Sequence, residues 1–208
     1  NPESLIAYEI GVRSQPLSNF TINAATFYYD FKNVQALILD GSLAVPAQRL
    51  GNIPGKSEIY GVEADVSFRP FTGFTLQSGI GLLHTKLAPF TNGSGTFTDN
   101  RFSNAPGFMW NGLARYETPI GNGDFNLVLQ GNFTHQSTAY KDASNDIYSV
   151  QHPYWLFDAR VALSWKDGKW EAALWGKNLT NKFYYTYGLN LNAFYLDYLA
   201  RGAPRTYG

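Results

Sequence analysis

The chain has 208 residues, no cysteine, a formal net charge of zero and a mean hydropathy of −0.25. The lack of cysteine excludes a disulfide framework and a thiolate metal site, and the neutral charge gives no bulk field that would attract nucleic acid or anionic lipid. There is no run of 18 apolar residues, which excludes a transmembrane helix but leaves open a membrane barrel, whose alternating strands average to mild polarity.

Apolar and polar residues alternate from the beginning of the chain, in the period-two pattern of a strand with one apolar and one polar face. The alternation is clear in residues 6–13, and a short connection at residues 16–19 follows. Residues 20–39 are aromatic and β-rich, but their parity blurs near residues 27–29, which predicts a bulge or a crossing of an aromatic girdle. Residues 40–56 carry Gly, Pro, Asn and Ser and are predicted to form a loop.

The middle of the chain contains two more pairs of strands, each joined by a short turn and followed by a long polar loop. The predicted strands are residues 60–69, 74–82, 108–117 and 125–134. The predicted loops are residues 88–106 and 137–153.

The clearest pattern lies in residues 154–181, which predict a long two-stranded hairpin. Every second residue from Trp155 to Trp165 is apolar, and the alternation resumes at Trp170. Between the arms, Asp167-Gly168 predicts a type I′ turn, which needs positive φ at both central positions. Each arm has about the 9–11 residues that a tilted strand needs to cross a bilayer. The three tryptophans lie near the ends of the apolar face, where membrane barrels keep their aromatic girdles.

The connections alternate between short and long along the whole chain. A fourth loop at residues 181–203 and the start of a ninth strand at residues 203–208 complete this pattern. Short turns at one rim and long loops at the other are typical of outer-membrane barrels, whereas soluble sandwiches have shorter strands of about 5–6 residues and no such asymmetry. We therefore predict an all-β fold, a transmembrane antiparallel up-and-down β-barrel with about eight complete strands and part of a ninth.

The two faces of the predicted strands differ in composition. If the apolar face contacts lipid, the polar face lines the lumen, because mixed charges are tolerated only beside water or a polar plug. The alternative is the solvated face of a soluble sheet, which the strand lengths and the two unlike rims disfavour. The predicted lumen-facing residues are Glu9, Arg13, Glu63, Asp65, Arg69, Arg115, Glu117, Asp158, Arg160, Glu171 and Lys177.

Six segments follow one another in a fixed order: NPE at 1–3, YEIGVR at 8–13, FYYDFKNVQ at 27–35, YGVEADVSFRP at 60–70, WGKNLTNKFY at 175–184 and GAPRTYG at 202–208. Each segment alone is weak evidence, but the six in order are specific. Together they resemble the C-terminal half of the barrel of TonB-dependent outer-membrane receptors, across essentially the whole chain.

The resemblance implies a barrel of about 22 strands with a plugged lumen. Residues 1–208 would be its C-terminal portion, with the plug domain outside this chain. The family's last strand runs on to a terminal aromatic residue, whereas this sequence ends at Gly208. That difference, together with a strand-like run directly after Asn1 and no signal peptide, predicts a piece of a longer chain.

The resemblance also implies partners and a location. The partners would be outer-membrane lipid, the protein's own N-terminal plug domain, the TonB energy-coupling complex and a small-molecule nutrient such as a ferric siderophore, with no nucleic acid. The location would be the outer membrane of a Gram-negative bacterium, crossed many times.

The loop at residues 181–203 is rich in aromatic side chains and poor in charge. Tyrosine offers a flat surface and a hydroxyl group at low entropic cost, which suits sugars, catecholates and macrocycles. The alternative is that these rings form the upper girdle or pack the loops together. The candidate substrate-binding residues are Tyr184, Tyr185, Tyr187, Phe194 and Tyr195.

Other reactive side chains show no functional spacing. His84, His135 and His152 are scattered, and residues 142–146 lack the closing Glu of a calcium loop. No GxSxG nucleophile motif is present. We therefore predict no metal site, no cofactor, no catalytic residue and no enzymatic activity.

Three functional hypotheses follow. The first is an active-transport receptor for a scarce nutrient, foremost a ferric siderophore, with oligosaccharide, cobalamin or haem as alternatives. The second is a passive porin or a structural barrel, and the third is a soluble β-rich carbohydrate-binding protein. A plug domain upstream would separate the first from the second, and a requirement for detergent during extraction would separate both from the third.

Overall fold

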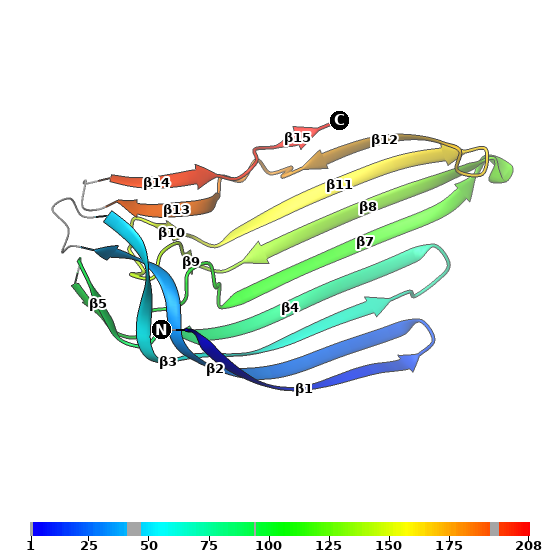
Figure 1. Ribbon diagram of the computed structural model, residues 1–208. Coiled ribbons are helices and arrows are strands. Elements are labelled where there is room, and N and C mark those ends of the chain that lie inside the picture. The colour runs from blue at the N-terminus through cyan, green and yellow to red at the C-terminus, as the bar shows by residue number, and fades with distance from the viewer. Residues whose placement is uncertain (1, 41–46, 94, 192–195) are drawn as a thin grey trace.

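A computed structural model describes residues 2–40, 47–93, 95–191 and 196–208, and its main body is one antiparallel sheet (Figure 1). In the described part of the chain this sheet has nine strands, which follow one another in chain order across the sheet. They are β1 (Ser4–Leu17), β2 (Phe20–Asp40), β3 (Ala47–Phe68), β4 (Phe74–Lys86), β7 (Phe108–Ile120), β8 (Phe125–Gln136), β11 (Tyr154–Trp165), β12 (Trp170–Lys177) and β15 (Thr206–Tyr207). The predicted antiparallel up-and-down arrangement is confirmed.

The two ends of the sheet are built differently (Figure 1). At the end called here the turn end, short turns join the strands, and one of them contains the 3₁₀ turn η1 (Gly121–Gly123). At the opposite end, the loop end, the connections carry small hairpins of their own. These are β5 (Phe90–Asn92) with β6 (Gly95–Phe97), β9 (Ala139–Tyr140) with β10 (Val150–Gln151), and β13 (Tyr185–Leu191) with β14 (Leu196–Arg201). No helix in the described residues is long and apolar enough to cross a membrane.

The prediction of a loop over residues 40–56 is wrong in its second half. β3 begins at Ala47, and its first residues continue the ladder with β2, for example through the pairs Leu37 with Leu50 and Val34 with Ile53. Pairing with a long partner strand thus overrides the weak strand propensity of a segment rich in Gly, Pro and Asn.

The bulge predicted in β2 is present, but at a different place. The register between β2 and β3 shifts at Asn33, not near residues 27–29, and Asn33 lies opposite Pro54 and Gly55. Proline has no N–H to give to the ladder, and Asn33 (φ 56°) and Gly55 (φ 100°) adopt left-handed conformations. The residues that suggested a loop therefore mark an irregularity inside a continuous hairpin.

The hairpin of β11 and β12 closes through the predicted turn. Asp167 (φ 56°) and Gly168 (φ 80°) both have positive φ, and the N–H of Lys169 donates to the carbonyl of Lys166 at 3.2 Å. The positive φ values predicted for Asp-Gly are present, and Lys166 (φ 52°) has a positive φ as well. Trp165 and Trp170 form the last residue pair of the ladder next to this turn.

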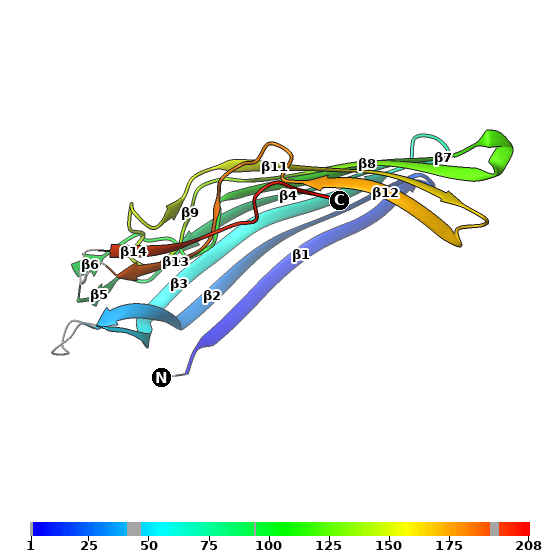
Figure 2. The same cartoon turned by 90° about the horizontal axis from the view of Figure 1, so that it is seen from above.

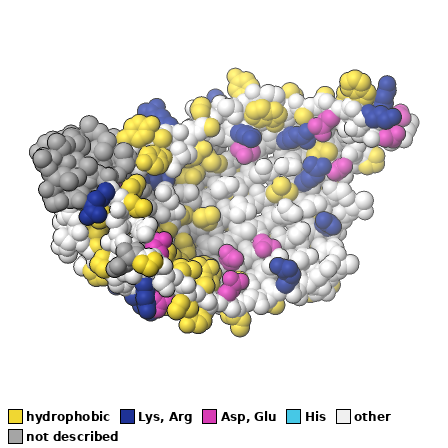
Figure 3. All heavy atoms as spheres, viewed as in Figure 1, with side chains coloured by type: hydrophobic (Ala, Val, Ile, Leu, Met, Phe, Trp, Pro, Cys, Tyr) yellow, Lys and Arg dark blue, Asp and Glu magenta, His cyan; other side chains and the backbone are white. Residues whose placement is uncertain are grey.

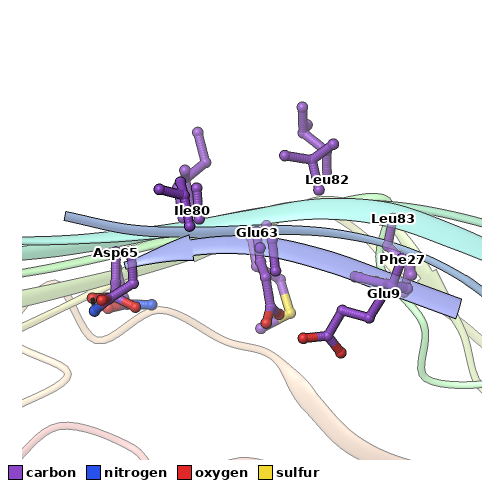
Figure 4. A pocket seen from close by; sticks show the side chains of 18 of the residues that line it. Glu9, Phe27, Glu63, Asp65, Ile80, Leu82 and Leu83 are labelled. Atoms are coloured by element: carbon purple, nitrogen blue, oxygen red, sulfur yellow. Dashed lines mark hydrogen bonds between the residues drawn. The ribbon is translucent and has the colours of Figure 1, made fainter. Parts of the chain in front are cut away.

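The pairing register defines two faces of the sheet, because directly paired residues of antiparallel strands project to the same side. Figure 4 shows Ile80 and Leu82 on one side of the sheet and Glu9, Glu63 and Asp65 on the other. We call these the apolar face and the polar face. The sheet is bent along its length (Figure 2), and a wide hollow lies on the polar face.

The apolar face is exposed over the whole sheet. Ile10 is 73% exposed, Val161 46% and Leu174 75%. Soluble monomers rarely expose apolar patches larger than a few hundred Å², so a continuous apolar sheet face indicates contact with lipid or with another apolar surface.

Aromatic side chains form a band at each border of the apolar face. Trp155 and Trp165 lie ten positions apart on β11. At about 3.3 Å per residue and a tilt of about 40°, this corresponds to a height of about 25 Å, which is the height of the apolar band of a membrane barrel. Ring contacts at the loop-end border join Trp110, Phe133, His135 and Trp155, and those at the turn-end border join Phe71, Phe74 and Tyr116, and Phe125 with Trp165.

A small buried core lies at the loop end, outside the apolar face. Its buried members come from β2, β3, the segment after β4, β5 and the segment after β9. Ile53 is fully buried, and the rings of Phe31 and Phe102 stack against each other at its edge, 6.1 Å apart. The buried residues are Val34, Ile53, Leu87, Ala88, Phe90 and Ala143.

Candidate functional site

The predicted lumen-facing residues lie together on the polar face. Glu63 and Asp65 project to it from β3 (Figure 4), and Arg160 is paired with Gln130, which is itself paired with Arg115. The register puts Asp158, Glu171 and Lys177 on the same side, and Arg69 borders a hollow beside Arg115 and Glu117 at the turn end. Figure 3 shows Lys, Arg, Asp and Glu side chains spread over the face of the sheet seen in Figure 1. That this face lines a lumen remains a prediction.

Toward the turn end, the charges of the polar face are paired with one another. Arg115 donates to the Glu117 carboxylate at 2.7 Å, and the side chain of Asn126 donates to the other oxygen at 2.6 Å. Arg160 donates to Glu171 at 2.5 Å across the β11–β12 hairpin. These partly exposed pairs fix the side chains but contribute modestly to stability, because water screens them.

Nearer the loop end, the polar face has a hollow of about 790 Å³. Glycines at positions 79 and 81 leave room on its wall, and the carboxylates of Glu9, Glu63 and Asp65 project into it (Figure 4). Asn23 donates to Asp65 at 2.7 Å. The hollow is wide, and its lining combines these polar groups with apolar side chains such as Phe27, Leu83 and Met109.

A second pocket, of about 410 Å³, lies where three long connections meet the loop-end parts of β2 and β3. We call it the loop-end pocket. Its wall combines apolar side chains of β2 and β3 with polar groups from the loops. Its lining includes Val34 and Leu37 of β2, Leu50 of β3, Phe102 and Asn104 from the segment after β6, Lys141 and Asp142 from the segment after β9, and Tyr187 of β13.

Side-chain to backbone hydrogen bonds hold the loops around this pocket in one arrangement. The side-chain oxygen of Asn145 accepts from the N–H of Arg101 at 2.7 Å, and its side-chain nitrogen donates to the Arg101 carbonyl at 2.9 Å. Asn100 donates to the carbonyl of Ala143 at 2.8 Å. The connection between β4 and β7 is therefore tied to the connection between β8 and β11.

Two adjacent charged residues of the pocket are poorly hydrated. Lys141 is 9% exposed and donates to the side-chain oxygen of Asn104 at 2.9 Å. Burial lowers the pKa of the Lys141 ammonium group. Burial also raises the pKa of the Asp142 carboxyl group, although Ser149 and the N–H of Ser144 donate to it.

The candidate aromatic residues are not gathered at one site. Tyr184 stacks on Tyr154 with ring centroids 4.9 Å apart, and Tyr185 packs edge-on against Phe183 at 5.0 Å. Only Tyr187 of the described candidates lines the loop-end pocket, where its ring is 46% exposed. The other two candidates, Phe194 and Tyr195, lie outside the described residues.

Sequence reasoning did not identify the polar groups of the loop-end pocket. Lys141, Asp142 and Asn104 stand in segments that read as solvated loops. They come together only because loops distant in sequence fold onto the same small core. The structure explains the glycine at position 188. A Cβ there would lie 2.5 Å from the Cβ of Lys141, so the close approach of the two segments requires glycine.

Comparison with known proteins identifies relatives of this fold. A protein-family model described as TonB-dependent receptor-like, beta-barrel, matches residues 1–179. No sequence among curated proteins matches the chain.

Several solved structures superpose on nearly the whole chain. The ferric yersiniabactin uptake receptor of Yersinia pestis matches 99% of this chain with a TM-score of 0.78 and 21% identity, over 29% of its own length. The ferric preacinetobactin receptor of Acinetobacter baumannii matches 98% with a TM-score of 0.69 and 24% identity, over 28% of its length. The ferric-catecholate import receptor of E. coli matches 100% with a TM-score of 0.67 and 17% identity, over 27% of its length. The chain thus spans less than a third of these receptors, and the likeness is one of fold.

Proposed function

Because this chain belongs to the TonB-dependent receptor-like β-barrel family, we propose that it forms part of the wall of an outer-membrane receptor that imports a ferric siderophore. The family consists of transport receptors of the Gram-negative outer membrane, and not of enzymes. We propose that residues 1–208 are the C-terminal portion of the barrel and that a plug domain, outside this chain, occupies the space beside the polar face. Energy for import would come from the TonB complex.

The observation that carries this proposal is the combination of a sheet that has one apolar and one charged face with a pocket at its loop end. The sheet has an exposed apolar face and a charged polar face, as the wall between lipid and an aqueous lumen requires. At the loop end, a pocket is formed where loops from three connections meet β2 and β3. A receptor needs this combination of a membrane wall and a ligand-sized pocket at one rim.

The hydrogen bonds between the loops favour selective binding of a ligand over passive diffusion of solutes through a pore. Arg101 and Asn145 exchange two hydrogen bonds, and Asn100 bonds to Ala143, so the pocket is held open before a ligand arrives. A preorganised pocket with apolar walls and a few polar groups is typical of small-molecule sites. A passive pore has no need of such a pocket.

The choice of a ferric siderophore is supported by the structural neighbours, whose names describe uptake of ferric yersiniabactin, ferric preacinetobactin and a ferric catecholate. The mixed apolar and polar lining of the loop-end pocket agrees with a ligand that carries rings and oxygen donors. Oligosaccharide, cobalamin and haem remain the alternative nutrients.

Uptake of radioactive iron tests the proposal. The whole receptor that contains this chain is expressed in cells that lack their own ferric-siderophore receptors, with TonB intact or deleted. We expect uptake of ⁵⁵Fe from at least one ferric siderophore, and its loss when TonB is deleted. Uptake that persists without TonB would identify a passive porin, and uptake of cobalamin, haem or oligosaccharide alone would reassign the nutrient.

A matched pair of tyrosine variants tests whether the loop-end pocket is the site of ligand capture. Tyr187 lines the loop-end pocket, whereas Tyr148 is 68% exposed on another loop and does not line it. Tyr187→Ala should reduce uptake more strongly than Tyr148→Ala. Equal effects would show that the loop-end pocket is not the site of ligand capture.

A further inference from the structure

Lys141 is a buried cation that has no anionic partner among the described residues. Its side chain is 9% exposed, and its ammonium group donates to the neutral side chain of Asn104 at 2.9 Å. No carboxylate in the described part of the chain forms an ion pair with it. Buried charges in proteins are usually paired, because desolvation of an unpaired ion is costly.

The carboxylate of the adjacent residue, Asp142, forms its hydrogen bonds with other groups and not with Lys141. Asp142 accepts hydrogen bonds from the hydroxyl of Ser149 and from the N–H of Ser144. It stabilises its own turn and does not neutralise Lys141. The positive charge is therefore available to a group that enters the loop-end pocket.

The packing of the loops fixes the position of this charge. A Cβ on Gly188 would lie 2.5 Å from Cβ and 2.9 Å from Cγ of Lys141, so β13 lies directly against the stem of the lysine. The ammonium group is thus held by contact with β13 on the stem and by the hydrogen bond to Asn104 at the tip. A preorganised donor in a poorly hydrated pocket interacts with an anion more strongly than one in water.

The rest of the pocket lining is mainly apolar, and its other polar members are Gln35, Ser103, Asn104 and Asp142. Val34 and Leu87 are buried members of the loop-end core, and Phe102 and Tyr187 contribute aromatic surface. The volume of about 410 Å³ has room for a ring system. The pocket therefore combines one fixed cation with surfaces suited to a flat apolar group.

We propose that the loop-end pocket binds an anionic oxygen, a carboxylate or a phenolate, through the ammonium group of Lys141, while the ring that carries the oxygen lies against the apolar wall. This inference rests on the proposed function, because it names the part of the nutrient that the receptor holds. Ferric siderophores and haem can both supply such a group. A neutral oligosaccharide cannot.

Equilibrium binding to the purified whole receptor in detergent tests the inference without transport. Two probes share the naphthalene ring and differ in the charge of the attached group: 2-naphthoate is anionic, and 2-naphthalenemethanol is neutral. In Lys141→Met, which keeps the length of the side chain and removes the charge, we expect the affinity for 2-naphthoate to fall roughly 10- to 100-fold. The affinity for 2-naphthalenemethanol should stay within about twofold, and Lys166→Met in the turn-end hairpin should change neither affinity.

Thermal unfolding of the same variants separates ligand binding from a structural role. If Lys141 serves the ligand, Lys141→Met relieves a buried charge and should unfold at the same temperature as the wild type or higher. A lower unfolding temperature together with unchanged affinity for 2-naphthoate would overturn the inference. An equal loss of affinity for both probes would also overturn it, because the charge would then not be what is recognised.

A second set of ligands identifies the source of the anion. Binding of a ferric catecholate chelate and of haemin is compared in the wild type and in Lys141→Met. The ligand whose affinity falls is the one held by Lys141, and unchanged affinity for both would contradict the inference. These binding experiments remain informative if TonB-dependent uptake fails, because they require no energised membrane.

Discussion

The nine-stranded sheet, called here the wall, leaves many of its large apolar side chains exposed, whereas the loop end buries a compact set of them. Ile10 and Leu174 on the wall are 73% and 75% exposed, but Ile53 at the loop end is fully buried. The wall is held by its backbone ladder and depends on an apolar environment outside the protein. The loop end is held by its own packing, as in a small soluble domain. Substitutions should therefore act on the two regions through different mechanisms.

The largest effect is expected from loss of packing at the loop end. Ile53→Ala should destabilise the loop end by about 2–5 kcal/mol, because it leaves a cavity in the small core. Hydrogen exchange of loop-end amides in the whole receptor would measure this loss. Ile147→Ala is the control, since Ile147 is 73% exposed on a neighbouring loop. If both variants exchange alike, the loop end has no core of its own.

A charged side chain introduced on the wall should lower stability slightly less than the loss of core packing does, and only when it lies on the apolar face. Val161→Arg places a cation on the apolar face near mid-strand and should cost about 2–4 kcal/mol of barrel stability in phospholipid vesicles. Ser164→Arg places the same cation on the polar face beside Glu171 and should cost little. Urea unfolding of the two variants would compare them. Equal costs would refute the assignment of the two faces.

The junction between wall and loop end depends on Asn178. This residue is 4% exposed, its side-chain nitrogen donates to the carbonyls of Lys182 and Ala203, and its oxygen accepts from the N–H of Lys182 at 2.7 Å. Asn178→Ala leaves these backbone groups unpaired and should cost about 1–3 kcal/mol, seen as faster hydrogen exchange in β13. Thr180→Ala, at an exposed position in the same turn, should leave that exchange unchanged. Unchanged exchange in Asn178→Ala would show that other contacts hold the hairpin.

The smallest effect concerns pH and is confined to the loop end. Burial raises the pKa of Asp142, so its stabilising contribution is complete below its ordinary value of 3.8 and is lost as the pH rises through the raised value. Acidification from neutral pH should therefore slow hydrogen exchange at the loop end more in the wild type than in Asp142→Asn. If the two proteins respond identically, Asp142 is not the titrating group. Amides in the middle of β11 provide the internal control.

The wall could be predicted from the sequence because its information is local. A period-two pattern assigns Val161 and Ser164 to opposite faces without knowledge of any distant residue. The Asp167-Gly168 pair specifies its own turn for the same reason, since few residues tolerate positive φ. These features require only the strand and its nearest neighbours.

The loop end could not be predicted, because its order comes from contacts between distant segments. Lys141 lies in a polar segment and is nevertheless buried. Gly188 packs against the aliphatic part of its side chain, and the side-chain oxygen of Asn104 accepts a hydrogen bond from its ammonium group. The stacking of Tyr184 on Tyr154 likewise could not be predicted, and the role of Tyr184 in ligand binding stays a prediction. The extension of β3 to Ala47 was missed because Pro and Gly within it occupy a bulge and not a loop.

The central claim is that the sheet separates lipid from water, and a spin-label scan of β3 tests it most directly. Nitroxides are attached to cysteines introduced one at a time from Val62 to Ser67 in the whole receptor, reconstituted in phospholipid vesicles. The labels at Val62, Ala64 and Val66 should be relaxed by oxygen dissolved in the bilayer, and those at Glu63, Asp65 and Ser67 by a water-soluble nickel chelate or by neither reagent. Accessibility to oxygen that does not alternate with a period of two would contradict the account.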